Sequence, residues 1–431
     1  MVHSTKNVVL KRCNFLDSTL VLISGARVQV KDTLFTQDDS STYECSIVAS
    51  GENTVLSMHG GKISGGVVGV TAYGGATASL TGVAFEHISV SGVEAKGSDT
   101  RADFTRCSFH SFSAGCQAPM HAVHALNGSF MFLDTVNMQG AHHIDYGLLV
   151  HTRASDRMHK CTVDYMTRCG AEILGGGTAD VVGCGFSHTD RAIHVAGVDS
   201  YCDARRCSIH HCKTGVLASR MGQVLLQQCN VKDSECGYSM TNGATMHSTE
   251  CTSEENEMGW RADKSGTRLM AQGSVGTDAR GPHVVHVAGG AKADFDSYTF
   301  RRSSREVVLI TSQRTSANLV GCTVSEGGGS CVLVHREAQA FVKWCMLSDS
   351  TEWHGLDAHD AGTRVQVIDC LSGDNAVWGF VAHCNAQCVV TGCRTVANGE
   401  RGYGSWHGGR MTVTDCSSQG EDDGHCGRLV E

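Results

Sequence analysis

The sequence has almost no proline, no long apolar run and no basic block. Its 431 residues include 2 prolines and 51 glycines. No apolar run reaches the roughly 18 residues of a membrane-spanning helix, and residues 1–7 do not lead into a signal-peptide pattern. The densest basic cluster is Arg301, Arg302 and Arg305, in a chain of net charge −9. We therefore expect an intracellular protein that binds neither membranes nor nucleic acid.

A disulfide framework is disfavoured as well, although the chain has 22 cysteines. Such frameworks stabilise small secreted domains, whereas 12 of these cysteines occupy one slot of a repeat. In the clearest stretch the slot is filled by Cys322, Cys345, Cys370, Cys393 and Cys416, at steps of 23, 25, 23 and 23 residues. We expect reduced thiols that pack as small hydrophobic side chains. The pairs Cys202/Cys207 and Cys384/Cys388 are left undecided.

The repeat itself predicts the fold. Apolar residues lie five and three positions before each of these anchors and two positions after it, as in short strands joined by a bend. We count 18 anchors at a period of mostly 22–25 residues, with Gly273 and Tyr298 in the slot where cysteine is missing. A second strand begins about 15 residues before the anchor, often with glycine, as at Gly355 and Gly379. This period fits neither a helical solenoid nor a leucine-rich repeat. We predict an all-β fold, a single-stranded right-handed parallel β-helix of about 18 rungs with three short strands per rung.

The repeat runs from end to end and predicts one continuous domain over residues 1–431. The longer step of 29 residues between Cys107 and Val136 predicts a loop insertion near 110–130. The acidic run 421–423 predicts a cap or a solvated tail over 419–431. Only seven residues precede the first rung, so two alternatives remain, a fragment or end-to-end self-association.

Histidines recur every 24 residues in one outward slot, at His335, His359 and His383. Residues in one slot of neighbouring rungs lie one strand spacing apart, and Asp357 and Asp360 flank this row. The pattern suggests proton transfer, with Asp357 or Asp360 orienting His359 and a second imidazole as the opposite acid or base. The candidate catalytic residues are Asp357, His359, Asp360, His383 and His354, and the candidate binding-face residues are His335, Arg336, Trp406 and His407.

Two other interpretations of this row remain open. One is a stacked ladder of exposed histidines without chemistry, and the other is a metal site formed by His359, Asp357 and His383. Our prediction includes no metal and no cofactor. A second imidazole-rich patch comprises His121, His124, His142, His143, Asp145, Tyr146 and His151.

The repeat resembles a known superfamily over nearly the whole chain. The segments from Cys184-Gly185-Phe186 to Cys207-Ser208-Ile209, and from Cys229-Asn230-Val231 to Cys251, resemble the β-helix repeats of carbohydrate-binding and sugar-hydrolase proteins of the pectate-lyase-like superfamily. They are especially similar to the intracellular branch, in which cysteine-lined β-helices of F-box receptors recognise proteins. That resemblance implies a protein-recognition surface, although no F-box or zinc-finger segment accompanies the repeat here.

A weaker resemblance concerns the alginate C5-epimerases. Their Tyr-Gly-Phe-Asp-Pro-His motif is similar to His354-Gly355-Leu356-Asp357-Ala358-His359. The resemblance implies that Asp357 and His359 match the catalytic acid and histidine of the motif, while His354 replaces its tyrosine and Ala358 its proline.

Two functional hypotheses follow. The first is an elongated binding or scaffold module that presents a flat strand face to a protein or polysaccharide partner. The alternative is a polysaccharide-active enzyme, a uronate lyase or mannuronan C5-epimerase that uses Asp357 and His359 for proton transfer. A fold alone does not choose between them, because this scaffold carries many functions.

Overall fold

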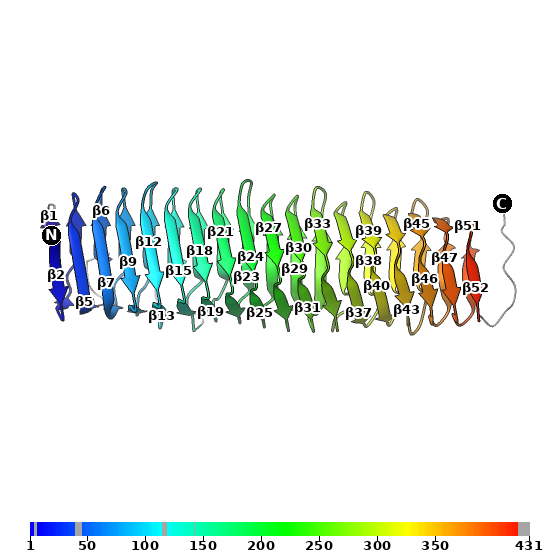
Figure 1. Cartoon of the computed structure of the whole chain (residues 1–431), viewed down its shortest axis with the longest axis horizontal. Coiled ribbons are helices and arrows are strands. Elements are labelled where there is room, and N and C mark those ends of the chain that lie inside the picture. Colours follow the sequence, from blue (N-terminus) through cyan, green and yellow to red (C-terminus); the bar gives the residue numbers. More distant parts are fainter. Residues whose placement is uncertain (4–6, 39–44, 114–118, 142, 421–431) are drawn as a thin grey trace. The chain divides into compact units, whose positions relative to one another are not determined.

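The computed structural model describes residues 1–3, 7–38, 45–113, 119–141 and 143–420. Every regular element in these ranges is a β-strand (Figure 1), which confirms the all-β prediction. Over the same ranges, no helix is long and apolar enough to cross a membrane. By its internal contacts the chain divides into unit 1, Met1–Lys213 with Gly222–Val224, and unit 2, Thr214–Met221 with Leu225–Glu431. The prediction of one continuous domain stays a prediction.

Unit 1 is built from turns that each contribute one strand to three ladders, and strands of successive turns pair in parallel. The first ladder contains β1 (Val2–His3), β4 (Leu20–Ile23), β6 (Cys45–Ser50), β8 (Val68–Tyr73), β11 (Ser91–Lys96), β14 (His121–Leu126), β17 (Tyr146–His151), β20 (Cys169–Leu174) and β23 (Arg191–Ala196). The second contains β2 (Asn7–Lys11), β5 (Arg27–Thr36), β7 (Val55–Ser64), β9 (Thr77–Thr81), β12 (Arg101–Thr105), β15 (Phe130–Asp134), β18 (Ser155–His159), β21 (Thr178–Val182) and β24 (Tyr201–Arg205). The third contains β3 (Asn14–Leu16), the ends of β5 and β7, β10 (Ala84–Glu86), β13 (Ser108–His110), β16 (Asn137–Gln139), β19 (Thr162–Asp164), β22 (Gly185–Ser187) and β25 (Ser208–His210).

Unit 2 repeats this plan, again with parallel pairing between turns. Its first ladder contains β26 (Thr214–Ser219), β29 (Cys236–Thr241), β32 (Met258–Asp263), β35 (Val285–Val287), β38 (Val308–Thr311), β41 (Val332–His335), β44 (Leu356–His359), β47 (Trp378–His383) and β50 (Arg401–Trp406). The second contains β30 (Thr245–Thr249), β33 (Arg268–Gln272), β36 (Lys292–Asp296), β39 (Ser316–Val320), β42 (Gln339–Lys343), β45 (Arg364–Ile368), β48 (Gln387–Thr391) and β51 (Arg410–Thr414), and β27 (Gln223–Gln227) is divided between the units. The third contains β28 (Asn230–Lys232), β31 (Thr252–Glu254), β34 (Val275–Thr277), β37 (Thr299–Ser303), β40 (Thr323–Gly327), β43 (Met346–Ser348), β46 (Leu371–Gly373), β49 (Arg394–Val396) and β52 (Ser417–Gln419).

The bend between the second and third ladders is made by the residue before each anchor. This residue takes a positive φ, for example 54° at Trp344, 49° at Asp369 and 58° at Gly273. The left-handed conformation turns the chain at one position and lets the next side chain point inward. Gly273 is therefore the bend residue and Ser274 fills the anchor slot, so the predicted register was wrong by one residue on this turn.

The anchor side chains hydrogen-bond from turn to turn as well as fill space. The backbone N–H of Cys322 donates to Cys345 Sγ at 3.4 Å, and that of Cys345 donates to Cys370 Sγ at 3.3 Å. In the same way, the backbone N–H of Cys251 donates to Ser274 Oγ at 2.9 Å. Cys322, Cys345 and Cys370 are free thiols, as are Cys384 and Cys388. The bend leaves a buried N–H without a strand partner, and a thiol or hydroxyl of the next turn satisfies it.

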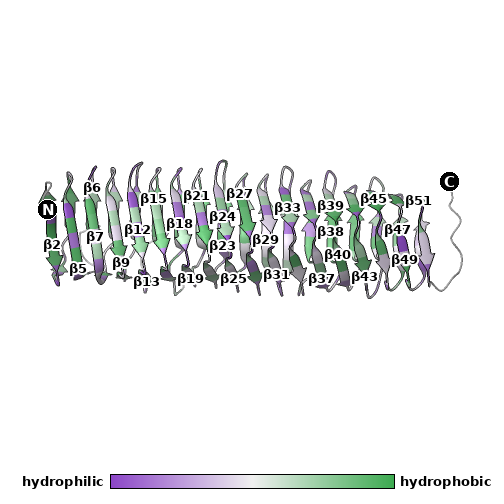
Figure 2. Cartoon of the chain, in the orientation of Figure 1, coloured by the Kyte–Doolittle hydropathy of each residue, from purple (hydrophilic) through white to green (hydrophobic). Residues whose placement is uncertain are grey.

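Inward side chains of successive turns stack into the core of each unit. In unit 1, Phe85 and Phe109 lie parallel with ring centroids 4.5 Å apart. In unit 2, Tyr238 and Trp260 stack at 4.0 Å. Figure 2 shows hydrophobic and hydrophilic residues mixed along the strands of each unit, as expected when successive side chains point to opposite faces.

Two sequence predictions include residues outside the described ranges. Residues 114–118 of the predicted insertion near 110–130 are among them, and β14 already begins within that insertion at His121. Residues 421–431 of the predicted acidic tail over 419–431 are also outside the described part, including the acidic run 421–423.

Candidate functional site

The predicted histidine row lies on the outward face of the first ladder in unit 2. His359 of β44 pairs with His383 of β47, and His383 pairs with Trp406 of β50. Their rings follow one another, with centroids 4.3 Å apart between the two histidines and 4.9 Å between His383 and Trp406. His335 ends β41 on the preceding turn, and its Nδ1 lies 3.8 Å from Asp360 Oδ2. The structure thus brings these sequence-predicted residues together.

Each of the two central histidines has its own carboxylate. His359 Nδ1 lies 2.6 Å from Asp360 Oδ1, and His383 Nε2 lies 2.9 Å from Asp357 Oδ1. Asp357 is buried, and its contact with His383 has the distance of an ion pair without the alignment of a hydrogen bond. The sequence left open which carboxylate lies beside His359, and in the structure Asp360 is the one in contact with it. Asp357 belongs to the neighbouring imidazole.

The third ring of the predicted catalytic set, His354, is buried beneath tryptophans. Its centroid lies 5.7 Å from that of Trp353, 6.3 Å from that of Trp378 and 6.0 Å from that of Trp406. Burial lowers the pKa of His354, and neither of its ring nitrogens has a hydrogen-bond partner among the described residues. A ligand reaches the buried His354 ring only if the side chains that cover it move aside.

Trp378 was missed by the sequence reasoning. Its Nε1 donates to Glu400 Oε2 at 2.7 Å, and the Arg401 guanidinium lies 5.8 Å from its ring. The ring covers Gly404, where a Cβ would come within 1.3 Å of Trp378 Cζ3. Glycine at 404 therefore makes room for the indole. The register of β47 and β50 pairs Gly404 with Val381 and Trp378 with Arg401, so the period of the repeat gave no signal for this contact.

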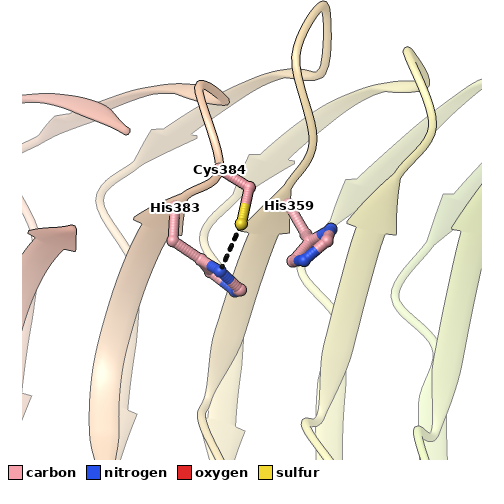
Figure 3. Close-up of side chains that lie close together, drawn as sticks. All are labelled: His359, His383 and Cys384. Carbon is pink, nitrogen blue, oxygen red and sulfur yellow. Dashed lines mark hydrogen bonds between the residues drawn. The ribbon is translucent and has the colours of Figure 1, made fainter. Parts of the chain in front are cut away.

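The residues that follow His335, His359, His383 and Trp406 form a row of corners. Arg336, Asp360, Cys384 and His407 all have positive φ, of 56°, 77°, 51° and 48°. Arg336 and His407 are exposed. The corner conformation turns the Cys384 thiol back toward the preceding side chain, and its Sγ lies 3.5 Å from His383 Nδ1 (Figure 3).

A shallow groove on the second ladder of unit 2 was not predicted. It has a volume of about 480 Å³ and crosses β39, β42, β45 and β48. The outward side chains that line it are Ser316, Asn318, Gln339, Phe341, Arg364, Gln366, Gln387 and Val389. Exposed slots of a strand accept almost any polar residue, and the only signal in the sequence was the recurrence of amide side chains on these turns.

The second predicted patch lies in unit 1, where three of its rings pack together and His143 is exposed. The His121 ring stacks at 4.6 Å on His124 and at 5.3 Å on Tyr146. Burial lowers the pKa of His121 and of His124 to about 4, so both imidazoles are neutral at pH 7. His142 lies outside the described residues. Close by, Glu172 Oε1 lies 2.7 Å from His194 Nδ1, a buried pair that the sequence reasoning did not single out.

Comparison with known proteins gives the family. The model of the right-handed β-helix region matches residues 146–279 and 272–418, which is more than half of the chain, and the chain belongs to this family. The predicted right-handed parallel β-helix is thereby confirmed. No curated protein matches the chain.

Solved structures with a similar course share little sequence. The A-module of the mannuronan C-5 epimerase AlgE6 from Azotobacter vinelandii is 10% identical with a TM-score of 0.32, over 91% of this chain and 90% of that one. A mannuronic acid-specific polysaccharide lyase of family 6 from human gut microbiota is 10% identical with a TM-score of 0.39, over 83% and 86%. Vag8, solved in complex with C1 inhibitor, is 11% identical with a TM-score of 0.34, over 94% and 99%. At these identities the likeness concerns the fold alone.

Proposed function

We propose that the chain is a carbohydrate-binding module and that the groove across β39, β42, β45 and β48 holds the glycan. The single observation that carries this proposal is the makeup of the groove, whose two outward slots carry four amide side chains, one aromatic ring and one guanidinium. This choice narrows the sequence-based hypothesis of a binding module for a protein or polysaccharide.

The amides suit a ligand rich in hydroxyl groups. Gln339, Gln366 and Gln387 are exposed, and in the described part of the chain their side chains make no hydrogen bond to protein. Each primary amide offers two N–H donors and a carbonyl acceptor, so it can both donate to and accept from a sugar hydroxyl. These three amides lie on successive turns about 4.8 Å apart. Gln339 and Gln387 flank Arg364 in one outward slot, and Gln366 lies in the neighbouring slot beside Phe341.

Phe341 and Arg364 complete the groove. The half-buried Phe341 ring offers an apolar platform on which the carbon face of a sugar ring can pack. Arg364 is the only cation that lines the groove, and it can pair with a single carboxylate of an acidic sugar. The volume of about 480 Å³ lies within the range of small-ligand sites. A stable protein interface would require a larger contact area than this groove offers.

In the catalytic alternative, an acid and a base lie on opposite sides of the sugar ring. The candidate residues lie together in the structure, but they do not face one another across a groove. The rings of His359 and His383 are in edge contact at 4.3 Å, so a sugar ring cannot lie between them as between an acid and an opposing base. Both imidazoles meet a ligand from one side. Lyase or C5-epimerase activity through Asp357 and His359 stays a prediction, and incubation with polymannuronate, alginate and pectate tests it.

We expect Phe341→Ala to weaken glycan binding about tenfold, because an aromatic platform contributes roughly 1 kcal/mol or more. The measurement is calorimetric titration of the full chain with the best ligand from a glycan array. Gln366→Ala should weaken binding by a smaller factor, as one hydrogen bond to a neutral ligand is lost.

The matched control is Gln272→Ala, which removes an exposed amide of β33 outside the groove. It should leave the affinity unchanged. Binding that survives Phe341→Ala and is abolished by His359→Ala would contradict the proposal, since the ligand would then lie on the first ladder.

A further inference from the structure

The side chains of His359, His383 and Cys384 converge at the ends of two neighbouring turns (Figure 3). His359 is the last residue of β44 and His383 the last of β47, and Cys384 follows in the corner. One ligand atom from each of the three residues lies within 4.8 Å of the others. All three side chains are partly exposed, so an ion can reach them from solvent.

We propose that His359, His383 and Cys384 form a binding site for a transition-metal ion, with zinc as the favoured ion. Imidazole and thiolate together are typical ligands of Zn²⁺, whereas Mg²⁺ and Ca²⁺ require oxygen ligands. The site differs from the groove proposed for glycan binding, and it does not depend on that function. It also differs from the metal set considered from the sequence, because Cys384 takes the place of Asp357.

The contacts of the ring nitrogens suit a metal site. His383 Nε2 lies 2.9 Å from Asp357, and its Nδ1 faces Cys384 Sγ at 3.5 Å. His359 Nδ1 lies 2.6 Å from Asp360, which leaves Nε2 for the ion. Each imidazole therefore offers one nitrogen to a metal while the other contacts a carboxylate. Where such a contact aligns as a hydrogen bond, it fixes the tautomer and raises the basicity of a metal-bound histidine.

The distances also fit a tetrahedral ion. With Zn–S of about 2.3 Å and Zn–N of about 2.0–2.1 Å, sulfur and nitrogen ligands lie about 3.5 Å apart. Cys384 Sγ and His383 Nδ1 already have this separation. The third ligand atom, from His359, lies within 4.8 Å of the other two, and β44 and β47 hold the two backbones at a fixed strand spacing.

Three protein ligands leave a fourth position for water or for an exogenous ligand. The site charge is also reasonable. A Zn²⁺ ion with one thiolate carries a net charge of +1, and the carboxylates of Asp357 and Asp360 offset it. Binding requires the Cys384 thiol to lose its proton, so the affinity should rise with pH.

The test is a titration of the reduced, chelator-treated full chain with zinc alone, followed by calorimetry. We expect one high-affinity ion per chain, and a Co²⁺ complex that shows the thiolate-to-cobalt charge-transfer band of a sulfur-ligated tetrahedral site. Cys384→Ser and His359→Gln should each weaken zinc binding at least 100-fold and abolish that band. Asp357→Asn should weaken binding 10–100-fold with the band retained, as for a group that positions a ligand.

Two matched controls accompany these variants. Cys416→Ser replaces a partly exposed anchor thiol by the residue that fills the same slot at Ser274, and His407→Gln removes an exposed imidazole one turn away. Both should bind zinc as the unmodified chain does, and circular dichroism verifies that every variant is folded. The proposal is overturned if no zinc binds at micromolar concentration, or if stoichiometric binding survives Cys384→Ser and His359→Gln, which would make it adventitious binding to other histidines.

Discussion

Trp260→Ala should destabilise unit 2 by about 3–5 kcal/mol, the usual cost of truncating a buried aromatic side chain. Trp260 points inward from β32 and is fully buried. It stacks on Tyr238 of the preceding turn at 4.0 Å and meets the Tyr298 ring edge-on at 5.7 Å. The cavity cannot collapse easily, because parallel ladders hold the backbones of successive turns at a fixed spacing of about 4.8 Å.

Urea unfolding followed by circular dichroism checks this result. Trp260→Phe keeps an aromatic ring in the stack, so it should lower the unfolding free energy by only roughly 1–2 kcal/mol. The cost should thus grow with the volume removed from the core. Trp344→Ala is the matched control, since that indole is 59% exposed and contacts the Lys343 ammonium. Its unfolding free energy should stay within about 1 kcal/mol of the unmodified chain. Equal midpoints for Trp260→Ala and Trp344→Ala would refute the prediction.

The repeat explains why so much of the architecture could be read from the sequence. In a parallel, in-register fold a period in the sequence becomes a neighbour in space, so the anchors from Cys322 onward and the row His359, His383 and Trp406 were predictable. The inward slots follow from alternation alone. The exception was Gly273, because glycine suits both the left-handed bend and a small inward slot, and the period of that turn does not separate the two.

The pairing of side chains within the row could not be read in this way. Asp357 reaches across one turn to His383, while His359 pairs with the adjacent Asp360. Period places both carboxylates beside both imidazoles, and rotamers decide the pairing. The contact of Cys384 with His383 likewise depends on the corner geometry at φ 51°. A repeat therefore predicts which residues are neighbours. Which of their side chains contact one another depends on rotamers and on the local backbone conformation.

Asp156→Val should stabilise unit 1, in contrast to the usual effect of a core substitution. Asp156 points inward from β18 and is 3% exposed. Neither of its carboxylate oxygens has a hydrogen-bond partner among the described residues. The same slot holds Met131 on the turn before and Ala179 on the turn after, so an apolar side chain is the rule there. Removing a buried, unsatisfied carboxyl should raise the unfolding free energy by roughly 2–3 kcal/mol at pH 8.

The sign of the pH dependence follows from the pKa of Asp156. Burial raises this pKa well above its usual range, so the folded chain keeps the proton while the unfolded chain loses it above about pH 4. Ionisation of this carboxyl stabilises the unfolded chain alone. The unfolding free energy of the unmodified protein therefore falls as the pH rises above the pKa of the unfolded state. The advantage of Asp156→Val should therefore be small at pH 4 and larger at pH 8.

Urea unfolding of Asp156→Val and the unmodified chain at pH 4 and pH 8 tests both the sign and the pH dependence. Asp156→Ala serves as a second variant in case valine overpacks the slot, since alanine fills the slot at Ala179. Asp180→Val on the neighbouring β21 is the matched control, because that carboxylate faces outward and bonds to Arg205. It should not gain stability with pH. If both Asp156 variants are less stable than the unmodified chain at pH 8, the buried carboxyl must have a compensating role in the fold, and its unpaired oxygens would then mark a functional position.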